Sequence, residues 1–269
     1  MPVDALFRDD FYLQRCDAMV TTVHEDGTFE TDRTCFYATS GGQPGDTGTA
    51  IRADGATLRL DVTRHGDGKD VILHVPAEGE APPSPGEKLS LAIDWPRRLK
   101  LMRMHTACHL LSVVCPFPIT GAAVGADESR VDFDMSETVD KQAVSDAMMK
   151  LVDEDHPVYV QWISDDELAA NPDIVKSKNV RPPTGMGRIS LVCIGENSSV
   201  DSQPCGGTHV RSTAEIGAVH IGKIEKKLAN GNFIAKAPAE VVEEQRERAA
   251  EYQQSHDKLS EALKRLSTL

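Results

Sequence analysis

The chain has 269 residues, 40% of them apolar, and a formal net charge of −13. This composition is typical of a globular protein with a sizeable core and excludes disorder of the whole chain. No apolar stretch reaches the roughly 18 to 20 residues of a membrane span, and the first residues are too charged for a signal peptide, so we expect a cytoplasmic protein without membrane contact. The six scattered cysteines favour reduced thiols or metal ligation over disulfides.

Residues 1–92 are expected to form a small β-barrel-like domain. Short alternating segments such as TLRLDV (57–62) and VILHV (71–75) are separated by Asp-Gly and glycine-rich turns. This pattern is typical of a small all-β unit, and the proline-rich segment 76–87 reads as a loop within it.

Residues 93–237 mix expected helices and strands without a regular βαβ alternation, which favours the α+β class. The first expected helix covers 96–115 and begins at Pro96, which suits a first helical position. Its apolar side would carry Leu99, Met102, Leu110 and Val113.

Two further helices are expected in this region. The first covers 136–155, with Ser136 as its N-cap and an apolar stripe of residues spaced by four. The second is short, because Ser164 and Glu167 form a capping box and Pro172 limits the helix. The stripe of the longer helix consists of Val139, Ala143, Ala147 and Leu151.

The remaining segments of this region are expected to be strands. The expected strands lie within 129–135, 158–164, 187–195 and 217–227, and the last of them turns at Asn230-Gly231. After Pro238 the chain contains no glycine or proline and is rich in helix formers, so 238–269 is expected to be a C-terminal helix. Its residues at alternating spacings of three and four form a stripe. This stripe could pack against a partner protein, against a second copy in a coiled coil, or against the rest of this chain.

Two pairs of side chains carry the spacing of metal ligands. His105 and His109 are four apart on the first expected helix, so both imidazoles project from one face. Cys205 and His209 flank a Gly-Gly turn. Together they form a nitrogen and sulfur set that suits tetrahedral Zn²⁺ better than Mg²⁺ or Ca²⁺. The alternative is that Cys205 is a nucleophile with a neighbouring histidine as its base.

The glycine-rich segment FYATSGGQPGDTG (36–48) lacks the spacing of nucleotide-binding loops, and no helix follows it. Its composition predicts a series of β-turns. The hydroxyls of Thr39 and Ser40 and the amide of Gln43 could line a small polar pocket.

The ordered set FYATSGGQPGDTG, HTACH, RVDF and CGGTHV followed by TAEIGAVHI resembles the editing region of alanyl-tRNA synthetase and the stand-alone AlaX-type proteins that share it. The resemblance spans roughly residues 1–237. The segment RPPTGMGRISLV resembles the stand-alone members more than the full synthetase. Position 108 is a cysteine where the synthetases usually carry a hydroxyl residue.

The resemblance implies a barrel-like domain over 1–92 and an α+β zinc-binding editing domain over 93–237. His105, His109, Cys205 and His209 would bind zinc and form the catalytic centre. The implied partner is alanine-specific tRNA, whose 3′ acceptor end would enter between the domains. A substrate pocket would contain a further set of residues. This set consists of Thr39, Ser40, Gly41, Gly42, Gln43 and Cys108.

The implied activity is hydrolysis of the ester that links serine, or glycine, to alanine-specific tRNA. Four protein ligands describe a closed zinc site, whereas activation of water needs an open position. Either one ligand yields during turnover or water is activated by other groups. The alternative function is that of a non-catalytic tRNA-binding or scaffold protein with a structural zinc.

Contacts with tRNA phosphates are expected from local basic clusters, because the overall negative charge repels a polyanion. The candidate residues are Arg97, Arg98, Lys176, Lys178, Lys223, Lys226 and Lys227.

Overall fold

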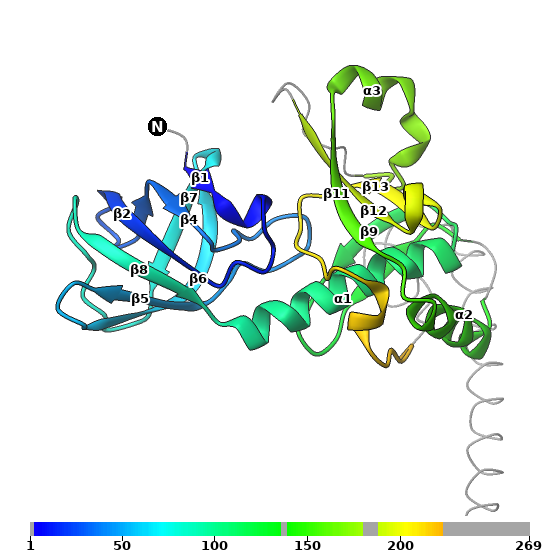
Figure 1. Ribbon diagram of the computed structural model, residues 1–269, viewed down its shortest axis with the longest axis horizontal. Helices are drawn as coiled ribbons and strands as arrows, with labels where there is room; N and C mark the ends of the chain where they lie inside the picture. Colours follow the sequence, from blue (N-terminus) through cyan, green and yellow to red (C-terminus); the bar gives the residue numbers. More distant parts are fainter. Residues whose placement is uncertain (1–2, 136–138, 180–187, 223–269) are drawn as a thin grey trace, which may run out of the picture. The chain divides into compact units, whose positions relative to one another are not determined.

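Six strands in the first third of the chain close into a barrel in the computed structural model (Figure 1). The order around the barrel is β2-β3-β7-β6-β5-β8, and all neighbouring pairs are antiparallel. The structure describes residues 3–135, 139–179 and 188–222. The barrel strands are β2 (Arg15–Val23), β3 (Phe29–Thr31), β5 (Gly48–Arg52), β6 (Thr57–Gly66), β7 (Gly68–Pro76) and β8 (Lys88–Ile93). The predicted barrel is confirmed.

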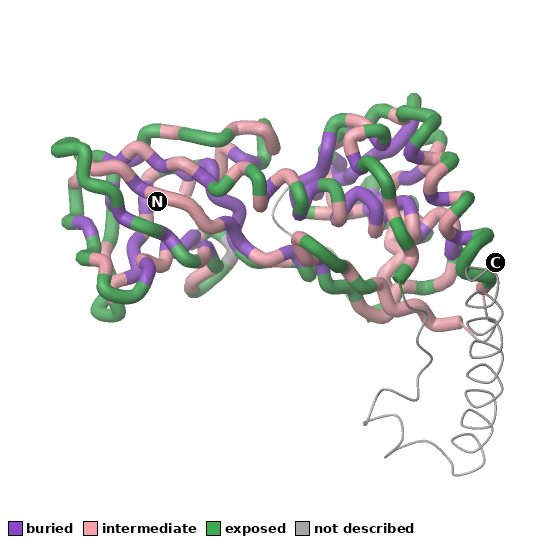
Figure 2. The backbone as a smooth tube through the Cα atoms, turned by 90° about the horizontal axis from the view of Figure 1, so that it is seen from below, coloured by how far each residue is buried: buried purple, intermediate pink, exposed green. Residues whose placement is uncertain are grey.

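Alternation of apolar and polar residues explains why these segments form the barrel. In β6, Leu58 and Leu60 are buried while Thr57 and Arg59 are exposed. Buried residues recur at every second position in β8 as well, and Figure 2 shows buried, intermediate and exposed residues mixed along the backbone. Leu58 and Leu60 share one core cluster with Phe29, Phe36 and other buried barrel residues. A further pair, β1 (Asp4–Ala5) and β4 (Arg33–Thr34), is parallel.

The part of the chain after the barrel mixes helices with antiparallel sheets. Its sheets are a hairpin of two strands and a sheet in the order β11-β12-β13, in which β11 is an edge strand. The strands are β9 (Ile119–Ala123), β10 (Arg130–Phe133), β11 (Val158–Ile163), β12 (Ile189–Ile194) and β13 (Asp201–Pro204). The helices are α1 (Trp95–Val114), α2 (Lys141–Asp153) and α3 (Asp165–Ala170), with 3₁₀ turns at Leu6–Arg8, Pro172–Ile174, Glu196–Ser198 and Thr213–Ile216.

The first and third helices form where they were predicted, although Leu99 and Val113 of the apolar side predicted for α1 are only half-buried. Helix α1 is capped by Asp94, which accepts a hydrogen bond from the backbone N–H of Arg97, and Pro96 lies in the first turn. In α3, the predicted capping box of Ser164 and Glu167 is present in both directions. No helix among the described residues is both long and apolar enough to cross a lipid bilayer.

The start of the second helix was predicted wrongly. Helix α2 begins at Lys141, and its N-cap is Asp140, which accepts a hydrogen bond from the N–H of Ala143. The predicted cap, Ser136, lies outside the described residues. The buried stripe is also one position later than predicted, because Ala143 is exposed. This stripe consists of Val144, Met148 and Val152.

The strand predicted over 217–227 is absent from its described part, since residues 217–222 form neither strand nor helix. The predicted turn at Asn230-Gly231 and the predicted C-terminal helix over 238–269 lie outside the described residues. Residues Met1–His220 form one compact unit and Ile221–Leu269 a second one. The boundary predicted between the barrel domain and the domain over 93–237 stays a prediction.

A buried ion pair joins the start of α1 to the barrel. The guanidinium of Arg98 has no exposed surface and donates hydrogen bonds to both carboxylate oxygens of Asp46. It also donates to the backbone oxygens of Phe11 and Cys35, each at 3.0 Å. Asp46 in turn accepts a hydrogen bond from the N–H of Tyr37. The prediction that Arg98 contacts tRNA phosphate is therefore wrong, because its charge is buried and fully paired.

We expect Arg98→Met to lower the free energy of unfolding by about 3 to 5 kcal/mol, because it leaves the buried carboxylate of Asp46 without its counter-charge. Urea unfolding followed by circular dichroism measures this loss. The matched control is Arg103→Met, which removes an exposed arginine from the same helix. Equal stability of the two variants would show that the buried pair does not hold α1 on the barrel.

His74 makes the stability of the barrel depend on pH. Burial lowers its pKa to about 3, whereas an unfolded histidine titrates near 6.5. The unfolded chain therefore takes up a proton below pH 6.5 that the folded barrel excludes. As the pH falls from 6.5 to 3, this linkage lowers the free energy of unfolding by up to about 1.4 kcal/mol per pH unit.

Urea unfolding at pH 7 and pH 5 should show a smaller loss of stability for His74→Gln than for the unchanged protein. His24→Gln, which alters an exposed barrel histidine, is the control and should keep the full loss. If His74→Gln has the same pH dependence as the unchanged protein, a different group is responsible.

Candidate metal centre

The four predicted ligands lie together in the structure. His105 and His109 come from α1, and Cys205 and His209 come from the loop that follows β13. One ligand atom from each lies within 4.8 Å of all the others. The Cys205 sulfur is 3.5 Å from Nε2 of His105 and 3.5 Å from Nε2 of His209. The i, i+4 spacing on the helix and the tight turn in the loop therefore converge on one point.

Gly207 allows the loop that carries Cys205 and His209 (the ligand loop) to lie close to helix α1. A Cβ atom at Gly207 would lie 2.1 Å from Cε1 of His105, which no real contact permits. The loop is also fixed by backbone hydrogen bonds, because the N–H of Cys205 donates to the carbonyl oxygen of Ser190 on β12. The N–H of Gly207 faces the Cys205 sulfur at 3.4 Å. A larger residue at 207 would separate the two pairs of ligands.

Each histidine of the cluster has a hydrogen-bond partner on its outer nitrogen. Nδ1 of His105 lies 2.8 Å from Oε1 of Gln43. Nδ1 of His109 lies 3.0 Å from the carboxylate of Asp201. For His209, the corresponding partner is the hydroxyl of Thr106 at 3.1 Å. Outer partners of this kind orient imidazole ligands in metal sites.

The partners of Gln43 and Thr106 determine which nitrogen carries the proton. The backbone N–H of Thr208 donates to Oε1 of Gln43, so this atom is an acceptor and His105 must donate to it from Nδ1. The Thr106 hydroxyl donates to the carbonyl oxygen of Met102, so it accepts from His209. In the neutral form of each ring, the proton therefore lies on Nδ1, and Nε2 faces the centre with a free lone pair, as a metal ligand requires.

Asp201 is the hydrogen-bond acceptor for the outer nitrogen of His109. Its carboxylate also accepts hydrogen bonds from Nζ of Lys176 at 2.5 Å and from Nε2 of Gln203 at 2.7 Å. Burial alone would raise the pKa of Asp201. The hydrogen bonds and charges of His109 and Lys176 outweigh this effect and lower the pKa to about 2. Asp201 is therefore ionised at neutral pH and accepts a hydrogen bond from Nδ1–H of His109.

The donor set and its spacing fit zinc. With Zn–N near 2.1 Å and Zn–S near 2.3 Å, tetrahedral nitrogen and sulfur ligands lie about 3.5 Å apart, which agrees with the two distances from the Cys205 sulfur. Burial raises the pKa of Cys205, but the three neighbouring histidines lower it well below the usual value. This direction favours the thiolate, the form that binds a metal.

The glycine-rich segment folds as the predicted turn, and Gln43 points inward from it. The backbones of Ser40 and Gln43 exchange both hydrogen bonds, and Gly41 and Gly42 form the turn with positive φ angles of 55° and 82°. Gln43 is fully buried, while both glycines are exposed. Gln43, which was predicted to line a substrate pocket, bonds to His105, a candidate metal ligand.

Two other predicted pocket residues have different surroundings. The hydroxyl of Thr39 accepts a hydrogen bond from the N–H of Gly45 and donates one to the carbonyl oxygen of Thr63. Thr39 would therefore lose a backbone hydrogen bond if it donated to a substrate. Cys108 lies half-buried on α1 between the two histidine ligands, and burial raises the pKa of its thiol to about 12. Cys108 is a neutral thiol at physiological pH.

Sequence reasoning missed Asp201, Thr106 and Lys176 as parts of the centre. Thr106 lies directly beside His105 in the sequence, but its contact with His209 spans 103 residues. Asp201 opens the segment that ends with the Cys205 and His209 pair, and its contact with His109 spans 92 residues. No spacing rule connects residues so far apart.

The other residues predicted to bind phosphate differ in whether their side chains already form ion pairs or hydrogen bonds within the protein. Lys176 is held by Asp201. Lys178 pairs with Asp134 at 2.6 Å, although 58% of its side chain is exposed. Arg97 donates to the carbonyl oxygen of Gly45. The remaining candidates, Lys223, Lys226 and Lys227, lie outside the described residues.

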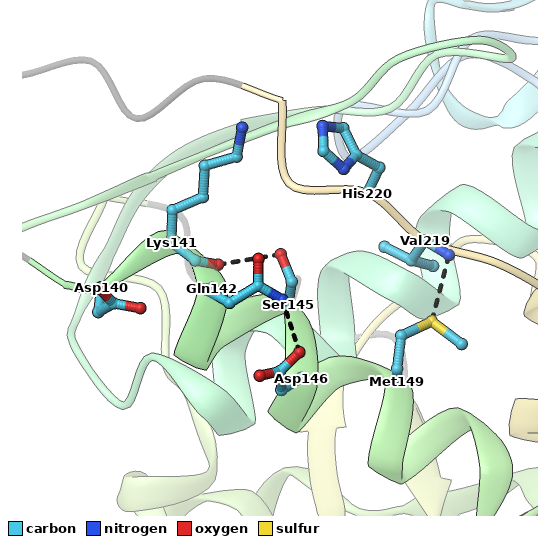
Figure 3. A pocket seen from close by; sticks show the side chains of 8 residues that line it. All are labelled: Asp140, Lys141, Gln142, Ser145, Asp146, Met149, Val219 and His220. Carbon is cyan, nitrogen blue, oxygen red and sulfur yellow. Dashed lines mark hydrogen bonds between the residues drawn. The ribbon is translucent and has the colours of Figure 1, made fainter. Parts of the chain in front are cut away.

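A separate pocket of about 530 Å³ lies at the N-terminal end of α2. Figure 3 shows its side chains, which come from α2, from its cap and from Val219 and His220. None of the predicted ligands or pocket residues lines it. This pocket is therefore distinct from the metal centre.

Comparisons with known proteins place this arrangement in a class. Residues 189–233 match the model of the threonyl and alanyl tRNA synthetase second additional domain. Residues 217–267 match that of the valyl tRNA synthetase tRNA binding arm. The barrel, the mixed body and the histidine and cysteine cluster thus define a protein related to the tRNA synthetases.

Individual relatives specify the family. The chain is 34% identical to an alanyl-tRNA editing protein AlaX-M of Methanosarcina acetivorans over 83% of this chain and 94% of that protein. It is 31% identical to an AlaX-L protein of Pyrococcus horikoshii over 85% of this chain and 56% of that protein. It is also 35% identical to an alanine–tRNA ligase of Pyrobaculum aerophilum over 84% of this chain and 26% of the ligase. The chain belongs to the AlaX family of alanyl-tRNA editing proteins.

We expect Gln43→Ala to lower the affinity for Zn²⁺ by about 10- to 100-fold, because His105 loses the acceptor that orients it. Competition with a chromogenic chelator measures the change. Gln142→Ala alters an exposed glutamine of α2 and should leave the affinity unchanged. Unchanged affinity in Gln43→Ala would contradict the orienting role of Gln43.

Proposed function

We propose that the chain is a zinc-dependent aminoacyl-tRNA deacylase that acts on alanine-specific tRNA carrying serine, or glycine. The observation that carries this proposal is the cluster of three imidazoles and one thiolate, each histidine with its outer nitrogen held. Membership of the AlaX family supports the proposal, since the relatives are described as alanyl-tRNA editing proteins. The cytoplasm, where aminoacyl-tRNA is used, is the proposed location.

The proposed ligands are His105, His109, Cys205 and His209. When bound, zinc would supply Lewis-acid polarisation of the ester and a lowered pKa for water. The protein holds the imidazoles in one tautomer through Gln43, Asp201 and Thr106. It therefore spends no free energy on turning these rings when the substrate arrives.

The surroundings of the ligands suggest the side from which the substrate approaches. The three histidines are buried, whereas Cys205 is half-buried and its neighbour Gly206 is exposed. A Cβ atom at Gly206 would meet nothing within 4 Å. We therefore place the aminoacyl ester on the side of Cys205 and Gly206.

Selection of the amino acid is assigned to a small polar pocket beside the centre. A site built for alanine cannot strongly reject serine or glycine, because a missing methylene is worth only about 1 to 3 kcal/mol and an added hydroxyl is poorly excluded. A second site that binds the serine hydroxyl can separate them. Thr39, Ser40, Gly41 and Gly42 of the turn, with Cys108 on α1, remain the proposed contacts.

Alanine-specific tRNA is the proposed partner, with its 3′ acceptor end at the metal centre. The match of residues 217–267 to a tRNA binding arm supports this partner. Contact of the C-terminal segment with tRNA, a second copy or another protein stays a proposal. Phosphate contacts would make binding weaken steeply as salt rises.

The test is to incubate the purified full-length protein with seryl-, glycyl- and alanyl-tRNA and to follow loss of the ester. We expect seryl-tRNA to be hydrolysed fastest, and we expect a chelator to abolish the reaction. His105→Ala should lose both bound zinc and activity, while His24→Ala, an exposed histidine of the barrel, should retain both.

Two outcomes would contradict the proposal. Absence of deacylation for all three substrates would leave the non-catalytic tRNA-binding protein as the function. Full activity of His105→Ala without bound zinc would show that the metal is not needed for the chemistry.

A further inference from the structure

An exposed tryptophan lies in register with a ligand of the metal centre. Trp162 on β11 pairs with Ser190 on β12. Leu191 pairs with Pro204, so Ser190 lies opposite Cys205, whose N–H donates to the Ser190 carbonyl oxygen at 3.0 Å. Directly opposite residues in a sheet point to the same face. Trp162, Ser190 and Cys205 therefore form a row across one face.

The row is short. Neighbouring strands lie about 4.8 Å apart, so two steps separate the Trp162 and Cys205 backbones by about 10 Å. Because β11 is an edge strand of this sheet, no further strand of the described residues pairs with it on the side away from β12. A large aromatic ring thus borders the approach to the centre.

Trp162 is paired with a cation. The guanidinium carbon of Arg188 lies 4.3 Å from the centroid of the indole ring. Arg188 is exposed and immediately precedes β12, and no carboxylate in the described part of the chain forms an ion pair with it. Trp162 itself is 36% exposed. An open aromatic ring with an arginine over it suits a nucleobase joined to a phosphate.

We propose that Trp162 and Arg188 form the platform on which the 3′-terminal adenine of the aminoacyl-tRNA stacks while its ester reaches the metal centre. This inference rests on the proposed deacylase function and names its nucleotide-binding site. Stacking on the indole supplies affinity, and the charge of Arg188 favours the adjoining phosphate. Trp162 is a positioning residue, since it touches the terminal nucleoside and not the ester.

The same strand supplies a matched control. Tyr159 is 38% exposed and thus as open as Trp162. Its cross-strand partner is Cys193, which belongs to the core cluster on the opposite face of the sheet. A change at Tyr159 removes an exposed aromatic ring from β11 without altering the face that carries Cys205.

Fluorescence tests the contact directly, because the chain has two tryptophans. In full-length protein with Trp95→Phe, all tryptophan emission comes from Trp162. Uncharged alanine-specific tRNA should quench this emission on saturation. The same tRNA lacking its terminal adenosine should bind with little quenching.

Kinetics provide the second measurement. Trp162→Leu should raise the KM for seryl-tRNA about fivefold or more, the loss expected for one stacked base, with little change in kcat. Trp162→Phe should restore most of the affinity, Arg188→Gln should raise KM, and Tyr159→Leu should leave both constants unchanged.

Quenching by intact tRNA that is lost with the terminal adenosine supports the platform. Equal quenching by both tRNAs, or no quenching although the protein binds and deacylates tRNA, overturns it and leaves the deacylase function standing. In the latter case the exposed tryptophan serves a different partner. Failure of the unchanged protein to bind or deacylate any tRNA instead removes the proposed function, and the platform with it.

Discussion

The metal centre depends on the three hydrogen bonds of one buried amide. The side chain of Gln43 extends from the glycine-rich turn beside the barrel. It bonds to His105 on α1 and to both the backbone N–H and the hydroxyl of Thr208 in the ligand loop. A buried amide without partners costs several kcal/mol, so each of these groups holds the others in place. The barrel turn thereby ties together the two segments that carry the ligands.

The same residues explain which parts of the site could be predicted from the sequence. The clustering of the four candidate ligands could be predicted because their spacing reflects local geometry: one helical turn for His105 and His109, and one tight turn for Cys205 and His209. Thr106 and Asp201 were missed because their contacts depend on tertiary packing. Arg98 was misassigned because a charged residue is usually exposed, and its partner Asp46 lies 52 residues earlier.

The fold shows the same division. The barrel strands were predicted because alternation in segments such as 57–62 is a local pattern that a half-buried sheet requires. In α2, Ala143 and Ala147 are apolar, and so are Val144 and Met148, so spacing by four fits two adjacent stripes. Packing of α2 against the rest of the protein buries the stripe of Val144, Met148 and Val152. Only the tertiary structure distinguishes this stripe from the one predicted.

The two glycines beside Cys205 have opposite steric requirements. Gly207 lies against the His105 ring, whereas Gly206 faces open space and has no positive φ angle. Side chains of increasing size at position 206 would grow into the space next to Cys205 without displacing a ligand. On the proposed approach of the ester, position 206 is therefore the place at which the space open to the amino acid could be narrowed without moving the four candidate ligands.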